Sequence, residues 1–339
     1  MMKVPSYPDS FEVLCLQAAD DGRGDALFGE SLARARKVAR PFMIGEEFPS
    51  VYLEFPLIGK PFLDVTLLYG KLKPGMRVES EAAEGTGEMI DWFAGACSDI
   101  GGICCGFELD VKDPALPRAA VHFQPRGNLE LVEPFCAAIG EPERAKLYLD
   151  MAARMPDEWQ LSFFGLFRGR PGSPLRVCGY LGEVKQACVE DPAYLAGVFD
   201  QIGFKAYDDV MLAQVREIMA TASGAIDFQF DVYDDGHLGD TFALDIQFGI
   251  EQPAAVFASF TDGPAARAMG KLEELGAADG RWKLGGDAAF ARSMNVELED
   301  GSTGRYAFTL MPQWVKARWT AGALQPSKLY HFASACLLE

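Results

Sequence analysis

The sequence predicts an α+β fold in which ten antiparallel strands close into a barrel surrounded by helices. Three observations support this prediction. Strand-like runs come in pairs joined by short turns, which indicates hairpins rather than a parallel sheet. Five such pairs alternate with helical stretches, roughly every 60–70 residues, as in structures built by repetition. Ten antiparallel strands are more than an open twisted sheet holds comfortably, so we expect closure.

The first hairpin follows an N-terminal helix that is predicted over Asp25–Ala39 and ends before Pro41. The turn-forming sequence IGKP joins two strand-like runs, Val51–Phe55 and Phe62–Tyr69. Apolar residues at helical spacing then predict a helix over Gly85–Ile100. The 339 residues are expected to form one domain, with the repeats over about 50–339.

The next three hairpins are predicted from alternating runs on either side of turn-forming residues. Their strands are expected over 105–111 and 119–126, 158–170 and 174–182, and 225–233 and 241–249. Helices are expected between them over Leu129–Ile139, Pro142–Met155, Pro192–Ile202 and Asp208–Ala222. The acidic segment DDGHLGD, Asp234–Asp240, is interpreted as the turn of the fourth hairpin, because glycines interrupt it and no second copy faces it.

The last repeat is expected to carry three helices before its hairpin. The helices are predicted over Gln252–Phe260, Pro264–Leu275 and Asp287–Met294. The strands of the closing hairpin are predicted over 305–319 and 327–337.

Composition and charge exclude several classes of protein. A net charge of −18 argues against a nucleic-acid-binding surface. No apolar run approaches the roughly 20 residues of a membrane span, and the first residues lack the apolar core of a signal peptide. Eight cysteines without a CxxC pair and only three histidines give little support for zinc. We therefore expect a cytoplasmic protein with reduced, mostly buried thiols.

Polar and apolar residues alternate along the predicted strands, so each strand has one polar face. The polar faces carry Tyr52 and Glu54; Glu108 and Asp110; His122, Gln124 and Arg126; Arg176, Cys178 and Tyr180; Asp227, Gln229, Asp231 and Tyr233; Asp245 and Gln247; Trp314, Lys316 and Arg318; and Lys328, Tyr330 and Phe332. If the amphipathic helices cover the apolar faces of a closed barrel, the polar faces line a ligand chamber. The alternative is a plain two-sheet domain whose polar faces are solvated.

This arrangement resembles the αββα-barrel (ABBA) aromatic prenyltransferases over most of the chain, roughly Val51 to Leu338. That family places cations and tyrosines at every second position of inward strands. The run Arg176-Val-Cys178-Gly-Tyr180 is similar, with a cysteine at the middle position, and Lys328-Leu-Tyr330 follows a Gln-Pro-Ser segment. The opening LEFPLIGKP resembles the cyanobactin peptide prenyltransferases most. Two departures are an absent inward cation on the second strand and His122 with Arg126 on the fourth.

The resemblance implies transfer of a dimethylallyl or geranyl group from its diphosphate to a nucleophilic side chain of a peptide, through an allyl cation. A small aromatic acceptor and a non-catalytic ligand-binding barrel are the alternatives. The residues it implies for the prenyl diphosphate are His122, Arg126, Arg176, Tyr180, Lys316, Arg318, Lys328 and Tyr330. The alternative for the cations among them is cross-strand ion pairing with Asp227, Asp231 or Asp245. The residues expected around the acceptor are Tyr52, Gln229, Tyr233, Gln247, Trp314 and Phe332.

Two carboxylates in the first hairpin interrupt otherwise apolar strands. Glu54 lies at the position of the family's catalytic acid, and its apolar neighbours predict a raised pKa suited to accepting a proton. An edge carboxylate in water is the alternative for Glu54. Asp64 is predicted to hold Mg²⁺ against the diphosphate, or otherwise to pair with Lys60 or Lys71.

Overall fold

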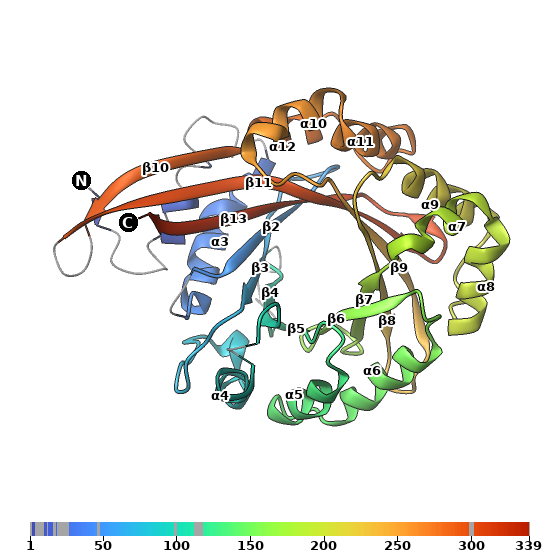
Figure 1. Ribbon diagram of the computed structural model, residues 1–339, viewed down its shortest axis with the longest axis horizontal. Helices are drawn as coiled ribbons and strands as arrows, with labels where there is room; N and C mark the ends of the chain where they lie inside the picture. The colour runs from blue at the N-terminus through green and yellow to red at the C-terminus, as the bar shows by residue number, and fades with distance from the viewer. Residues whose placement is uncertain are drawn as a thin grey trace.

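The computed structural model describes residues 2–3, 10–11, 13–15, 18, 27–45, 48–97, 100–111, 118–297 and 302–338. Ten of its strands form a closed antiparallel barrel, seen nearly end-on in Figure 1. Around the ring they are β2 (Ser50–Pro56), β3 (Asp64–Tyr69), β4 (Cys104–Leu109), β5 (Ala120–Gln124), β6 (Gln160–Leu166), β7 (Leu175–Tyr180), β8 (Ile226–Val232), β9 (Leu238–Gln247), β11 (Thr303–Thr320) and β13 (Lys328–Leu338). Because β11 pairs with β13 on one side and with β9 on the other, the ring has no gap. The predicted fold class is confirmed.

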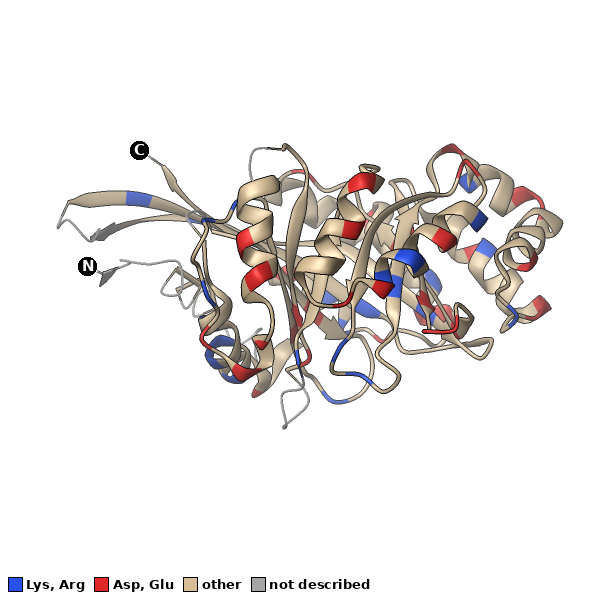
Figure 2. Ribbon diagram, turned by 90° about the horizontal axis from the view of Figure 1, so that it is seen from below, with Lys and Arg blue, Asp and Glu red and all other residues tan. Residues whose placement is uncertain are grey.

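Helices surround the barrel on its outside (Figure 1). They are α3 (Ser31–Ala39), α4 (Gly87–Ala96), α5 (Val132–Ala138), α6 (Glu143–Arg154), α7 (Lys185–Glu190), α8 (Pro192–Ile202), α9 (Asp209–Thr221), α10 (Val256–Asp262), α11 (Pro264–Glu274) and α12 (Trp282–Asp287). Short 3₁₀ turns are η1 (Arg40–Phe42), η2 (Glu81–Ala83), η3 (Leu129–Leu131), η4 (Gly182–Val184) and η5 (Pro253–Ala255). Figure 2 shows acidic residues spread over several of these outer helices.

Helix α8 shows how local sequence sets these elements. The Asp191 side chain accepts a hydrogen bond from the backbone N–H of Ala193, and Pro192 occupies the first turn. Gly203 ends the helix with a φ of 86°, a left-handed conformation that glycine adopts at little cost. The helix therefore begins and ends where its capping residues place it.

The main hydrophobic core lies between the outer face of the barrel and the helices. Phe123 of β5 stacks on Phe135 of α5 with ring centroids 4.2 Å apart. Phe242 of β9 packs against Phe199 of α8 at 5.0 Å. Since helices cover the apolar strand faces, the polar faces point into the barrel. The alternative of two solvated sheets is therefore wrong.

Strand β10 (Phe290–Glu297) corrects one prediction, because no helix covers Asp287–Met294. Helix α12 ends at Asp287, and β10 pairs with the part of β11 that extends beyond the barrel. Two-residue strands β1 (Met2–Lys3) and β12 (Ala323–Leu324) pair with β10 and β11. The helical prediction failed because the partner of β10 lies in a later segment of the chain, which local spacing does not show.

Smaller features agree with the sequence or refine it. All eight cysteines are free, and six of them are buried. The predicted turn at Asp234–Asp240 is shorter than expected, since β9 already begins at Leu238. Within the described ranges, no helix has both the length and the apolar character that crossing a membrane demands.

Close strand packing at Gly179 of β7 gives a first prediction. A Cβ atom there would lie 2.2 Å from the carbonyl oxygen of Gln160 and 2.6 Å from a ring carbon of Phe228. Gly179→Ala is expected to lower the free energy of unfolding by about 2 kcal/mol or more, because the strands must move apart. Urea denaturation measures this change.

Gly197 in α8 is the matched control, since nothing lies within 4 Å of a Cβ atom there. Gly197→Ala should leave stability unchanged or raise it by up to about 1 kcal/mol, as expected for an exposed helical glycine. Equal unfolding midpoints for the two variants would contradict the close packing at Gly179.

Candidate active site

Two cavities occupy the barrel interior and share a wall that includes Arg176, Lys316 and Tyr330. The first has a volume of about 260 Å³, and we call it the cation cavity because its wall carries Arg170, Arg176, Lys316, Arg318 and Lys328. The second has a volume of about 290 Å³, and we call it the aromatic cavity because Tyr52, Phe163, Tyr180, Trp314 and Tyr330 line it. The barrel thus places a charged chamber beside an aromatic one.

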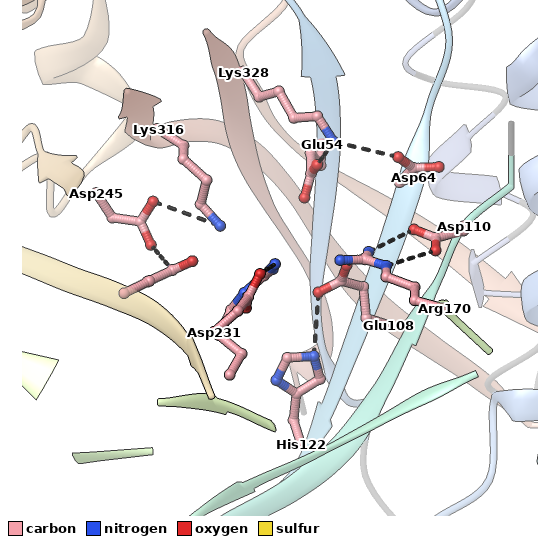
Figure 3. A network of polar contacts seen from close by, with 12 residues as sticks. Glu54, Asp64, Glu108, Asp110, His122, Arg170, Asp231, Asp245, Lys316 and Lys328 are labelled. Atoms are coloured by element: carbon pink, nitrogen blue, oxygen red, sulfur yellow. Dashed lines mark hydrogen bonds and ion pairs between the residues drawn. The ribbon is translucent and has the colours of Figure 1, made fainter. Parts of the chain in front are cut away.

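Glu54 lies at the centre of an ion-pair cluster in the cation cavity (Figure 3). It is 4% exposed and stands opposite Asp64 and Tyr330 in neighbouring strands. Lys328 donates a hydrogen bond to Glu54 and lies 3.5 Å from Asp64. Strand alternation on β2, β3 and β13 turns all three side chains inward.

The prediction that the pKa of Glu54 is raised is wrong. Burial is the largest effect and disfavours the carboxylate, but Lys328, through its charge and its hydrogen bond, and the charge of Lys316 together lower the pKa of Glu54. The alternative of an edge carboxylate in water is also wrong, because the side chain is buried. Glu54 is therefore a charged, ion-paired group in the barrel interior.

Two arginines of the cation cavity are also held by carboxylates. Arg176 donates to both oxygens of Asp231, at 2.9 and 3.2 Å. Arg170 bridges Glu108 and Asp110 at 2.8 and 2.9 Å (Figure 3). These forked contacts fix the orientation of each guanidinium group.

Lys316 connects the two cavities. Its Nζ lies 3.7 Å from Asp245 and 5.0 Å from the centre of the Tyr330 ring. Gln229 donates a hydrogen bond of 2.5 Å to the other oxygen of Asp245 (Figure 3). A cation at this place can act on a ligand in either cavity.

Arg318 differs from the other cations of the cavity, because no carboxylate within the described residues forms an ion pair with it. Burial lowers its pKa, and the nearby positive charges of Arg176 and Arg170 lower it further. Although neighbouring atoms desolvate it in this way, part of the Arg318 side chain stays accessible in the wall of the cation cavity. An anion that bound there would relieve this repulsion.

Asp227 and Asp245 stand opposite each other on β8 and β9 in the wall of the aromatic cavity. Burial and the Asp245 charge raise the pKa of Asp227 to about 8. Burial also raises the pKa of Asp245, to about 6, although Lys316 opposes that shift. Gln247 donates a hydrogen bond of 3.1 Å to Asp227. Both aspartates therefore keep a proton to a higher pH than an ordinary aspartate does.

Aromatic rings stack into a continuous wall along the aromatic cavity, and one of them, Tyr330, also lines the cation cavity. The Trp314 ring lies 4.9 Å from Tyr330, nearly parallel to it, and 4.7 Å from Tyr52. Tyr52 in turn contacts Phe332 at 5.5 Å. Ring faces at this place can shield a cationic carbon from water.

The structure brings together most of the residues that the sequence singled out. The cavity walls include Tyr52, Glu54, His122, Arg126, Arg176, Tyr180, Gln229, Gln247, Trp314, Lys316, Arg318, Lys328 and Tyr330. Phe332 supports this wall through Tyr52 without lining either cavity. Tyr233 does not reach the cavities, because a register shift follows Phe230 and its ring stacks on His237 at the hairpin end.

Sequence reasoning missed Arg170 as a site residue. It lies in the turn after β6, where the period-two pattern no longer indicates a direction. The alternative of cross-strand ion pairs is confirmed for Arg176 with Asp231 and for Lys316 with Asp245. The pairing of Glu108 with Arg170 was not predicted. Only the barrel's register shows which charges meet.

The protein donors around Asp64 do not by themselves form a Mg²⁺ site. Lys328 lies between Asp64 and Glu54, a position that favours an ammonium ion over a metal. Across the described ranges, no group of three His, Cys, Asp or Glu side chains is placed to hold an ion. The expected partners Lys60 and Lys71 are replaced by Lys328, and Mg²⁺ binding stays a prediction.

Comparison with known proteins places the fold. No family model matches the chain, and no curated protein matches its sequence. The structure of 5-dimethylallyltryptophan synthase from Streptomyces coelicolor aligns with a TM-score of 0.54 and 15% identity, covering 97% of each chain. The same enzyme in complex with DMASPP and Trp aligns with a TM-score of 0.54 over 98% of this chain and 96% of that one, at 15% identity. Prenyltransferase PriB in its apo form aligns with a TM-score of 0.48 and 13% identity, covering 98% and 96%.

The alignments with the Streptomyces coelicolor enzyme, at a TM-score of 0.54, define the fold as the αββα barrel of the ABBA aromatic prenyltransferases. The alignment covers nearly the whole length of both chains, so the five hairpins and their helices share one order. At 15% identity the likeness concerns the fold, and chemistry has to be argued from the side chains of this chain.

The raised pKa of Asp227, about 8, predicts a pH dependence of stability. The unfolded chain releases this proton near pH 3.9, whereas the folded chain keeps it until about pH 8. Asp227 therefore makes the folded state less stable as pH rises through this range. Asp227→Asn removes the effect, so its stability relative to the wild type should rise from pH 4 to pH 8 by a few kcal/mol and then level off.

Urea denaturation at a series of pH values measures this difference. Asp262→Asn, at an exposed position in α10, serves as the control and should show no such trend. A difference between wild type and Asp227→Asn that stays constant or falls with pH would show that Asp227 is ionised throughout.

Proposed function

We propose that this protein is an enzyme that transfers a prenyl group from a prenyl diphosphate to a small aromatic acceptor. One observation carries the proposal: inside a closed barrel, a cluster of five cations adjoins a wall of stacked aromatic rings. Cations suit a diphosphate, and aromatic faces suit the allyl cation and a ring acceptor. Lys316, which lies over the Tyr330 ring, marks where the two environments meet.

The cation cavity is the proposed diphosphate site. Arg318 is the cation without a carboxylate partner among the described residues, so it gains most from binding an anion. Arg176 and Lys328 are held by Asp231 and Glu54 and would contribute hydrogen bonds to the phosphate oxygens. As the C–O bond breaks, these groups stabilise the negative charge that develops on the leaving diphosphate.

The aromatic wall is the proposed shield for the allyl cation. Trp314, Tyr330 and Tyr52 present ring faces and edges to the aromatic cavity, and Tyr330 also lines the cation cavity. Their π-electrons favour a nearby cationic carbon, and the surrounding barrel keeps water from converting it to an alcohol. The acceptor ring then forms the new bond to the allyl carbon and loses a proton.

Glu54 is the proposed acceptor of that proton. Its ion pair with Lys328 keeps it deprotonated before reaction, which a base requires. When Lys328 turns to the diphosphate, Glu54 loses its counter-charge and its affinity for a proton rises. The release of diphosphate and the capture of the proton are thereby linked through one ammonium group.

A small aromatic acceptor fits better than the peptide implied by the opening resemblance. The aromatic cavity, about 290 Å³, has the size of a single ring system rather than of a peptide segment. The aligned Streptomyces coelicolor enzyme is a 5-dimethylallyltryptophan synthase and was solved in complex with DMASPP and Trp. Dimethylallyl and geranyl donors, and peptide acceptors, belong in the test as separate arms.

A ligand-binding barrel without turnover is the second candidate. It is favoured by the carboxylates that hold four of the five cations of the cation cavity and that a diphosphate would have to displace. Product formation separates the two functions, since a binding barrel would retain prenyl diphosphate and release it unchanged.

The first functional prediction concerns Glu54. Wild-type protein incubated with dimethylallyl or geranyl diphosphate and a panel of indoles, phenols and peptides should yield a product heavier by one prenyl group. Glu54→Gln should lower the rate by about 10²–10⁴-fold, because the proton then has no carboxylate to receive it. Mass spectrometry of timed samples measures both.

Glu88→Gln, at an exposed position on α4, is the matched control and should retain the wild-type rate. The wild type yielding no product with any acceptor would sink the enzymatic proposal. Full activity of Glu54→Gln would show that Glu54 is not the group that accepts the proton.

The second functional prediction concerns Arg318. Arg318→Met should weaken binding of an unreactive thiolodiphosphate analogue by about tenfold or more, because a charge-assisted contact with the anion is lost. Isothermal titration calorimetry measures the affinity. Arg267→Met, on the outer helix α11, is the control and should bind as the wild type does. Equal affinities for both variants would place the diphosphate elsewhere.

A further inference from the structure

Asp227 is a buried carboxylate that the proposed transfer chemistry does not use. Its side chain is 6% exposed and belongs to the wall of the aromatic cavity. Gln247 donates to one carboxylate oxygen, while the other, Oδ1, has no hydrogen-bond partner among the residues that the structure describes. A buried polar atom without a partner is costly, so its presence in a ligand cavity needs an explanation.

The surroundings of Asp227 do not supply a counter-charge. Among the described residues, no Lys or Arg lies within ion-pairing distance of it, although Lys316 on β11 and Arg126 after β5 act on it from farther away. Asp245 on β9 adds a second negative charge opposite it. Tyr180 stands opposite on β7, and burial raises its pKa above that of an ordinary phenol, so it is a neutral group there.

The two aspartates differ in what compensates them. Asp245 has Lys316 at 3.7 Å and accepts a hydrogen bond from Gln229. Within the described part of the chain, the amide of Gln247 is the one hydrogen-bond donor to the Asp227 carboxyl group. Of the two facing carboxyl groups, Asp227 is therefore the one without a nearby cation among the described residues, and it lines the same cavity as the aromatic rings.

We propose that Asp227 binds a protonated amine carried by the aromatic acceptor, so that the acceptor class is aromatic compounds with a primary ammonium group. The ammonium would donate to the unpartnered Oδ1 of Asp227, and the ring would lie against the aromatic wall. An ammonium beside both a carboxylate and aromatic faces gains from both. The inference rests on the proposed prenyl transfer in one respect, namely that the bound amine is the acceptor of the prenyl group. Binding of the amine does not itself require turnover.

Binding of this kind has a pH signature. In the free protein Asp227 holds a proton up to about pH 8, and an arriving ammonium must replace it. Affinity for an ammonium ligand should therefore increase as pH rises from about 6.5 to 8.5, while the amine itself stays protonated. A neutral ligand of the same shape should bind equally at both pH values.

The test compares two probes that differ only in the charged group: tryptamine and 3-ethylindole. Isothermal titration calorimetry of the full chain without donor gives both affinities. At about pH 8.5 the wild type should bind tryptamine at least about tenfold more tightly than 3-ethylindole. This preference should shrink at about pH 6.5, a result that needs no variant and is independent of folding defects.

Two variants locate the effect. Asp227→Asn should weaken tryptamine binding about tenfold or more and leave 3-ethylindole binding unchanged. Asp245→Asn is the matched variant on the opposite strand: it should keep the preference and move its pH dependence to lower pH, because Asp227 loses a repelling charge. Equal wild-type affinities for the two probes overturn the proposal, as does a preference that survives Asp227→Asn.

Failure of this inference can be distinguished from failure of the proposed function. Prenylated product from neutral indoles, together with binding that is indifferent to charge, would remove the ammonium site and leave the transferase standing. Selective tryptamine binding without any product would leave the ammonium site and remove the transferase.

Discussion

The pairing of β11 with β9 is the interaction on which the site depends. It joins residues 314–320 to residues 241–247 and closes a sheet that would otherwise have two long open edges. Closure turns every polar strand face toward one enclosed volume, where water no longer screens the charges. Carboxylates and cations that would be ordinary surface residues on an open sheet therefore act on each other strongly. The low pKa of Glu54 and the high pKa of Asp227 both follow from this closure.

Inside the barrel, most of the cations described above lie beside a carboxylate. Burying an ion pair costs desolvation energy that the attraction between the ions only partly returns, so such pairs are a poor explanation for stability. These ion pairs do fix the orientation of side chains. The two hydrogen bonds from Arg176 to Asp231, for example, hold the guanidinium group in a single orientation. A lumen held in this way is preorganised, and an incoming anion meets cations that are already in place. Arg318 adds to this set a cation without a carboxylate of its own among the described residues.

Period-two alternation made much of this predictable from the sequence. It assigned Glu54, Arg176 and Lys316 to inward faces because side chains on a strand must alternate, whatever the partner strand is. It could not give partners, since Lys328 and Glu54 are 274 positions apart in the chain. For that reason the pKa of Glu54 was predicted to be raised, whereas it is lowered. Desolvation by apolar neighbours can be inferred from the local sequence, but the distant residue that supplies the neutralising charge cannot. The same limit applies to β10, whose helix-like sequence is overridden by pairing with β11.

The fold by itself does not require the carboxyl groups of Asp227 and Asp245. Their positions need side chains that tolerate a polar interior, and the neighbouring Gln229 and Gln247 meet that need without charge. Two carboxylates facing each other across β8 and β9 add repulsion that makes the barrel less stable once both ionise. Lys316 relieves one of them, and within the described residues nothing comparable relieves the other. A ligand cation would relieve Asp227 at its unpartnered oxygen, so the same contact would bind the ligand and stabilise the loaded barrel.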